Sequence, residues 1–145
     1  MGRDFEFFHG LAICKIIHFR KLHSISLYPS PSNSSYILND DFGIFIKYST
    51  KRLSPWRYSF LKEHQDEIKK MADELGKVFI LLVCNNDGVV CLSYKELKQI
   101  LNANHEETEW ISATRRRREH YMIKGTDGKL KFKIGPGDFP KKLFQ

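Results

Sequence analysis

Apolar positions recur at helical spacing at the start of the chain and then alternate along several short segments. The spacing of three and four residues predicts a helix over residues 5–19 that buries one wide face. The positions that carry this pattern are Phe5, Phe8, Leu11, Ala12, Lys15, Ile16 and Phe19. The following segments alternate, or are rich in β-branched and aromatic residues, and are bounded by turn formers. They predict strands at residues 23–28, 36–39, 43–50 and 56–60.

The second half of the chain returns to helical spacing and then to strands. A helix is expected over residues 62–75 and should end at Gly76. The continuous apolar run at residues 78–84 is typical of a central strand covered on both faces. Ser93 and Glu96 have the spacing of a capping box. The remaining predicted elements are a short helix up to residue 101 and strands at residues 89–93, 110–114, 120–124 and 129–134.

This order of elements predicts an α+β fold. A helix, three to four strands, a second helix and a central strand should surround a mixed sheet, followed by a basic β extension at the C-terminal end. At 145 residues the chain has the size of one compact domain that can bury a core without disulfides. We therefore expect a single domain over residues 1–145.

The positive charge of the chain is concentrated near its C-terminal end. The formal net charge is +7, and residues 112–145 hold ten basic and three acidic side chains, so the whole excess lies there. Residues 1–111 form a neutral body. A cationic quarter on a neutral body indicates a polyanionic or acidic partner.

Several classes of protein find no support in the sequence. Cys14, Cys84 and Cys91 form no CxxC pair and have apolar neighbours, which favours buried thiols in a reducing cytoplasm over metal ligands. No His and Cys cluster has zinc spacing, so no metal site is expected. The chain also lacks an apolar run long enough for a membrane span, a glycine-rich phosphate loop and a nucleophile elbow. We expect a cytoplasmic protein without a membrane partner.

A lysine on an otherwise apolar strand is a possible hydrolytic residue. Lys47 lies in the strand expected at residues 43–50, and Asp40 and Asp41 precede that strand. Carboxylates near a lysine can bind a divalent metal and activate water. The alternative is that Lys47 lies on the solvent face with its stem along the sheet and that the two aspartates only form a turn.

These residues, in this order of elements, resemble the PD-(D/E)xK nuclease superfamily, the restriction-endonuclease-like proteins. The resemblance covers residues 5–93 and implies a Mg²⁺-dependent nuclease with an acid on the first helix and E-x-K on the third strand. Phe45 stands where that family has a metal-binding carboxylate, so another carboxylate, such as Glu63 or Glu67, would have to replace it. The positions that match the family's motif are Glu6, Asp40 or Asp41, Lys47 and, on the second helix, Gln65.

The basic residues of the C-terminal quarter give the strongest indication of function. Arg115, Arg116, Arg117 and Arg118 form an uninterrupted run. In the strand expected at residues 129–134, Lys129, Lys131 and Lys133 should share one face while Leu130, Phe132 and Ile134 share the other. Such a stripe could neutralise phosphates. The alternative is a solvated face that keeps the domain soluble and protects a sheet edge.

A second basic cluster falls between two predicted strands. Lys51, Arg52 and Arg57 surround Trp56, as on a surface that clamps a nucleic-acid strand. The alternative is that Trp56 anchors this loop to the core, because tryptophan is mostly buried.

The leading expectation is a small cytoplasmic nucleic-acid-binding protein on a nuclease-like core, without hydrolytic activity and without a cofactor. DNA is favoured over RNA. A Mg²⁺-dependent nuclease using Glu6, Asp40 or Asp41, and Lys47 is the first alternative. The second alternative is a protein-binding module, for example a phage or mobile-element protein whose basic face binds an acidic patch on a host protein and inhibits it. The stretch at residues 39–60 also looks like small bacterial and phage-borne proteins, a resemblance that implies no activity.

Overall fold

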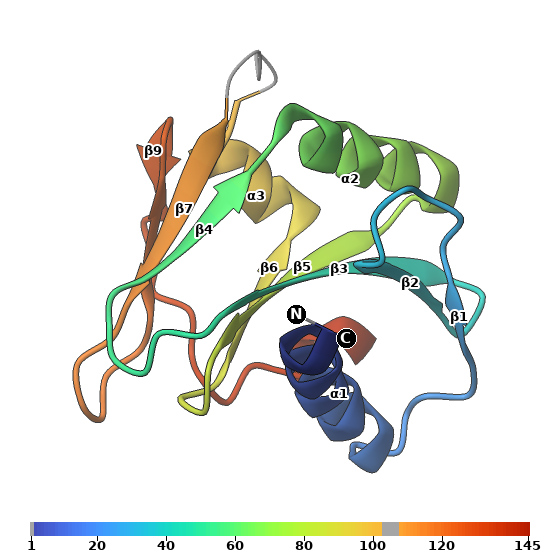
Figure 1. The fold of residues 1–145 in the computed structure, drawn as a ribbon, viewed down its shortest axis with the longest axis horizontal. Coiled ribbons are helices and arrows are strands. Elements are labelled where there is room, and N and C mark those ends of the chain that lie inside the picture. The colour runs from blue at the N-terminus through green and yellow to red at the C-terminus, as the bar shows by residue number, and fades with distance from the viewer. Residues whose placement is uncertain (1, 103–107) are drawn as a thin grey trace.

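A computed structural model describes residues 2–102 and 108–145 of the chain. The elements follow the predicted order in an α+β fold (Figure 1). They are α1 (Gly2–His18), β1 (Ile25–Leu27), β2 (Ser35–Leu38), β3 (Phe42–Ser49), β4 (Trp56–Phe60), α2 (Lys62–Leu75), β5 (Val78–Cys84), β6 (Val89–Ser93), α3 (Tyr94–Ile100), β7 (Glu109–Thr114), β8 (Met122–Gly125), β9 (Gly128–Lys129) and a 3-10 helix (Lys141–Phe144).

A five-stranded mixed sheet forms the centre, in the order β1-β2-β3-β5-β6. β3 pairs antiparallel with β2 and parallel with β5. Both edges of β3 are therefore occupied, and β4 cannot join this sheet beside it. Of the three to four strands expected before the second helix, three (β1, β2 and β3) therefore belong to this sheet, and β4 pairs with β7 instead.

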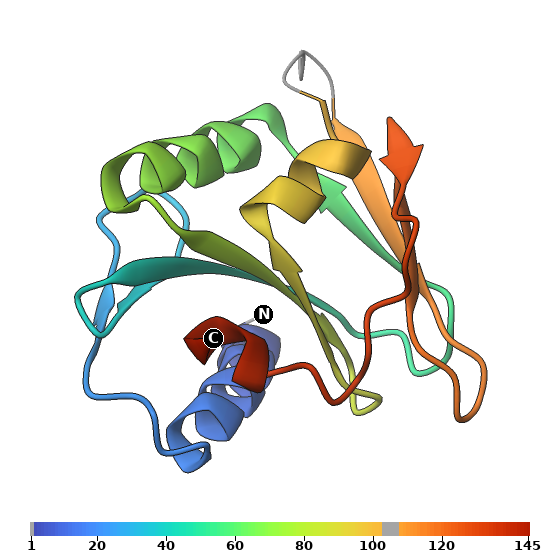
Figure 2. The same ribbon diagram turned by 180° about the vertical axis from the view of Figure 1, so that it is seen from behind.

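Helices cover both faces of this sheet. α1 and the C-terminal 3-10 helix lie on one face, while α2 and α3 lie on the other (Figures 1 and 2). Alternation along β3 sends Ile44 and Ile46 toward α1 and Phe45 toward α2. Gly43 allows α2 to approach closely, because a Cβ there would lie 2.5 Å from Sδ of Met71.

The second sheet has the order β4-β7-β8-β9, and most of it comes from the basic C-terminal part of the chain. Its inner face joins the same apolar core as α2 and α3, through Tyr58, Ile111 and Ile123 among others. The basic β extension is therefore packed onto the body of the protein through β4. Lys142 fastens the tail further by an ion pair of 2.7 Å with Glu96.

The segment after β9 departs from the predicted strand. Leu130 donates its N–H to the carbonyl of Ile123, and Ile134 pairs with Tyr121. Between these two contacts the segment advances by four residues, from Leu130 to Ile134, while β8 and the residue before it advance by only two, from Tyr121 to Ile123. The segment therefore holds two extra residues, and residues 131–133 leave the strand pairing as a bulge. Leu130 and Ile134 stay buried, but Phe132 is 82% exposed and does not share their inward face as expected.

Other local predictions have mixed outcomes. The capping box of α3 is confirmed, since Glu96 N–H donates to Ser93 Oγ over 3.1 Å and Ser93 N–H donates to Glu96 Oε1 over 2.8 Å. Cys84 and Cys91 are buried, but Cys14 is exposed because it lies on the outer side of α1. Within residues 2–102 and 108–145, none of the helices is long and apolar enough to cross a membrane.

Candidate nucleic-acid interface

Three loops meet at one end of the molecule, which we call the basic loop end: residues 50–55, 85–88 and 115–120. They are joined by hydrogen bonds from Asn85 Nδ2 to the Thr50 carbonyl, 2.7 Å, and from Arg115 N–H to Ser54 Oγ, 3.0 Å. Figure 1 shows the loops before β4, after β5 and after β7 on the same side of the fold. The two basic clusters seen in the sequence are therefore brought together.

The basic loop end encloses a hollow of about 330 Å³. Its cationic lining, apart from Arg115, consists of Arg52, Arg116, Arg117 and Arg118. All four side chains are exposed, and none has an ion pair within the part of the chain that the structure describes. Four exposed guanidinium groups around one hollow create a positive potential that can attract an anion with several charges.

Arg115 has a different role from its three neighbours. Its guanidinium forms a two-pronged ion pair with Asp87, with nitrogen to oxygen distances of 2.9 and 3.1 Å. The Tyr121 hydroxyl donates to the same carboxylate over 2.5 Å. Burial raises the pKa of Asp87, but the hydrogen bonds from Arg115 and Tyr121 outweigh it and leave that pKa below its usual value. Arg115 therefore holds the loop in place, and its assignment as a phosphate contact is corrected.

Trp56 also belongs to the scaffold of this end. It is 2% exposed, its ring packs against Tyr121, and its indole N–H donates to the Lys51 carbonyl over 2.8 Å. Trp56 therefore anchors the loop to the core, as the alternative reading of this cluster expected, and its assignment as a nucleic-acid contact is corrected because its ring faces are covered. Lys51 and Arg52 remain exposed on the loop that Trp56 anchors.

A basic row crosses the outer face of the second sheet. In register, Arg57 lies opposite Ser112, Ser112 opposite Lys124 and Lys124 opposite Lys129. The guanidinium carbon of Arg57 lies 4.6 Å from the ring centre of Trp110, which is half-exposed. Sequence reasoning missed Trp110, because the pairing of β4 with β7 that places it beside Arg57 is a long-range contact.

The bulge beside the loops carries further charge. Lys131 and Lys133 are exposed, and Lys133 Nζ lies 3.4 Å from Glu119 Oε1. This contact and the pairing of Tyr121 with Ile134 place residues 131–133 next to the loop that carries Arg116, Arg117 and Arg118.

The nuclease residues are not brought together. Glu6 is exposed on α1, which packs on the sheet face of Ile44 and Ile46. Asp40 and Asp41 form the turn before β3, and Lys47 lies six residues beyond Asp41, roughly 20 Å along the strand. The predicted cluster is therefore corrected: Lys47 lies on the α2 face of the sheet, away from both Glu6 and the two aspartates.

Lys47 instead lies in a half-buried setting of its own. Its ammonium group donates to the carbonyl of Ser59 and lies 3.1 Å from His64 Nδ1 and 5.0 Å from the ring centre of Phe60. Burial lowers the pKa of Lys47 to about 8. Burial, and then the charge of Lys47, lower the pKa of His64. Because Nδ1 accepts from the Leu61 N–H as well, the imidazole proton lies on Nε2.

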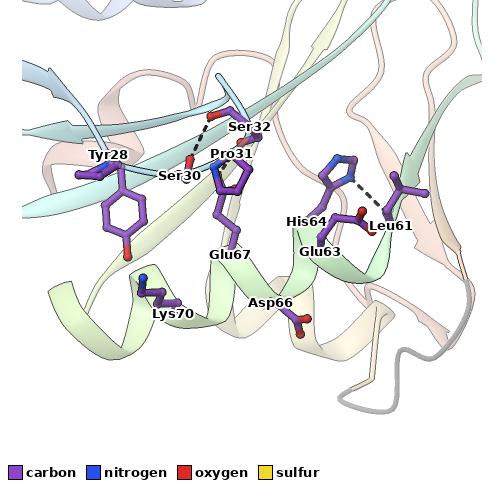
Figure 3. A pocket seen from close by; sticks show the side chains of 11 residues that line it. Tyr28, Ser30, Pro31, Ser32, Leu61, Glu63, His64, Asp66, Glu67 and Lys70 are labelled. Carbon is purple, nitrogen blue, oxygen red and sulfur yellow. Dashed lines mark hydrogen bonds between the residues drawn. The ribbon is translucent and has the colours of Figure 1, made fainter.

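His64 borders a pocket of about 410 Å³ between α2 and the loop that follows Tyr28 (Figure 3). Glu67 points from α2 toward that loop, where the hydroxyls of Ser32, at 2.6 Å, and Ser35 donate to its carboxylate. Glu63, the other carboxylate considered for a metal, also lines the pocket. Over the described residues, however, no three His, Cys, Asp or Glu side chains gather closely enough to hold a metal ion.

Comparison with protein-family models, with curated proteins and with solved structures found no match for this chain.

Proposed function

We propose that this protein binds nucleic acid through the basic loop end and the adjoining bulge at residues 131–133. One observation carries the proposal: two basic segments about 60 positions apart in the sequence converge around one hollow lined by Arg52, Arg116, Arg117 and Arg118. A phosphate backbone, with its regularly spaced charges, matches such a cluster.

The distribution of acidic groups supports the same function. Asp87 and Glu119, the carboxylates nearest the cluster, are engaged by Arg115 and Lys133. The outer basic row adds a second argument, because Lys124 and Lys129 lie directly opposite each other, an arrangement that costs stability. A polyanion lying across the row would relieve that repulsion.

The test is a salt titration with fluorescently labelled DNA, repeated with RNA. The combined variant Arg116→Gln, Arg117→Gln and Arg118→Gln should flatten the slope of log K against log salt by about 2 to 3, since each lost phosphate contact removes somewhat less than one unit. The matched control combines Lys62→Gln, Lys69→Gln and Lys70→Gln on α2, which removes the same charge from another surface and should leave the slope nearly unchanged. Equal slopes for the two variants, or no binding at 20 mM salt, would overturn the proposal. Absence of binding would favour an acidic protein surface as the partner.

A metal-dependent nuclease is a second candidate, favoured by the setting of Lys47. A lysine whose pKa lies near 8, in contact with a histidine that borders a pocket, differs from an ordinary surface lysine. If the protein cleaves DNA in Mg²⁺ or Mn²⁺, Lys47→Met should abolish cleavage while DNA binding by the arginine cluster persists. Cleavage retained by a folded Lys47→Met variant would exclude this site.

A further inference from the structure

Phe132 has a position that the packing of the protein does not require. The two residues that flank the bulge on the apolar side, Leu130 and Ile134, are 6% and 4% exposed, while Phe132 between them is 82% exposed. The bulge keeps Leu130 and Ile134 in the core and lifts the aromatic ring out of it. A single exposed apolar side chain is ordinary on a protein surface, so the groups around this ring decide what it can do.

The charges around Phe132 indicate what it contacts. Lys131 and Lys133 flank it and are exposed, and the contact between Lys133 and Glu119 ties the bulge to the loop that carries the arginine cluster. An aromatic ring between cations, continuous with a phosphate-binding surface, has the composition of a platform for stacking a nucleic-acid base.

Stacking requires a base whose face is free. In a duplex the base faces are covered by neighbouring pairs, and a protein meets phosphates and base edges. In a single strand the bases can turn outward onto an aromatic ring. We infer that the nucleic acid bound here is single-stranded, with one base stacked on Phe132 and the adjacent phosphates held by Lys131 and the arginine cluster, while Lys133 stays paired with Glu119. This inference rests on the proposed function and names its ligand class.

The outer face of the second sheet could bind the part of the nucleic-acid strand that extends beyond Phe132. Lys129 precedes the bulge by two residues and lies opposite Lys124, and the half-exposed ring of Trp110 is on the same face of the sheet as Lys124. A strand leaving Phe132 along this row would meet cations and a second aromatic ring, already held against Arg57.

The experiment compares a labelled 20-nucleotide single strand, a duplex of the same length, and a 20-unit strand of abasic sites. The wild-type protein should bind the single strand more tightly than the other two. Phe132→Ala should weaken binding to the single strand by about 5- to 100-fold, bring it closer to the affinity for the abasic strand, and leave the salt slope unchanged because no charge is lost. Phe132→Trp should restore the affinity. Leu27→Ala, which removes another exposed apolar side chain on β1, away from the basic loop end, is the matched control and should change the affinity less than twofold.

The failures are distinguishable. If Phe132→Ala binds the single strand as tightly as the wild type, or if the wild type prefers the duplex, the inference is overturned while the arginine-dependent salt slope still supports nucleic-acid binding. If no nucleic acid binds at 20 mM salt, both this inference and the proposed function are overturned. Loss of binding to anionic lipid vesicles in Phe132→Ala, with unchanged binding to the single strand, would overturn the inference in favour of a membrane surface.

Discussion

Positive charge is shielded in the five-stranded sheet and exposed to solvent at the basic loop end. Lys47 lies on β3 near the middle of the sheet, and its ammonium group is shielded by Phe60, His64 and a backbone carbonyl. The guanidinium groups of Arg116, Arg117 and Arg118 extend from a loop into solvent around a hollow. A charge on a central strand perturbs the protein itself, whereas a charge on an anchored loop is available to a partner.

Aromatic side chains show the same contrast between the core and the surface, and a pair of substitutions tests it. Phe45 is fully buried between the sheet and α2, whereas Phe132 is 82% exposed. Phe45→Ala should lower the free energy of unfolding by about 3–5 kcal/mol, because it removes buried apolar contacts and leaves a cavity. Phe132→Ala should change it by less than about 0.5 kcal/mol. Urea denaturation followed by circular dichroism measures both, and a similar loss for the two variants would show that Phe132 belongs to the core.

Within the arginine run, the boundary between scaffold and binding surface falls after Arg115. Arg115→Ala removes the ion pair to Asp87 and leaves a partly buried carboxylate, so it should lower the free energy of unfolding by about 1–3 kcal/mol. Arg117→Ala should leave stability within about 0.5 kcal/mol and weaken nucleic-acid binding. Thermal unfolding and the salt titration, run on the same two variants, separate the effects. Equal stability losses would contradict a scaffold role confined to Arg115.

Much of the fold could be predicted because its signals are local. The continuous apolar run of β5, the capping box of Ser93 and Glu96, and the glycine that ends α2 each depend on residues close together in the sequence. The partner of β4 could not be predicted in this way. It depends on both edges of β3 being occupied, which is a property of the assembled sheet.

The candidate site shows the same limit. The arginine run was visible as a run, but the diversion of Arg115 to Asp87 depends on a contact across 28 positions of the sequence. The inward face expected for Phe132 followed from strict alternation. The two extra residues of the bulge displace that alternation, and nothing in the composition of residues 129–134 marks where they fall.

The smallest effect we predict concerns the pH dependence of the shielded lysine. The folded protein loses the Lys47 proton at a pKa of about 8, against 10.5 for an ordinary lysine. Below pH 8 both states carry the proton, and the cost of burying the charge is present in full. Between pH 8 and 10.5 the unfolded chain binds more protons at this position, so the cost is relieved as the pH rises.

Lys47→Met removes this cost at every pH and therefore isolates it. The stability advantage of Lys47→Met over the wild type should be largest at pH 7 and shrink by about 1–2 kcal/mol by pH 9.5, at roughly 1.4 kcal/mol for each unit of pKa shift. Burial raises the pKa of Cys84 and of Cys91 to about 12, which destabilises the folded state in the same range, but both proteins carry these thiols and the difference cancels their effect. Lys70→Met, which replaces an exposed lysine of α2, is the control and should differ from the wild type by the same amount at all these pH values. A constant difference for Lys47→Met as well would mean that Lys47 keeps its proton in the fold. A neutral lysine would then no longer support the nuclease alternative, and the proposal that nucleic acid binds at the arginine cluster would be unaffected.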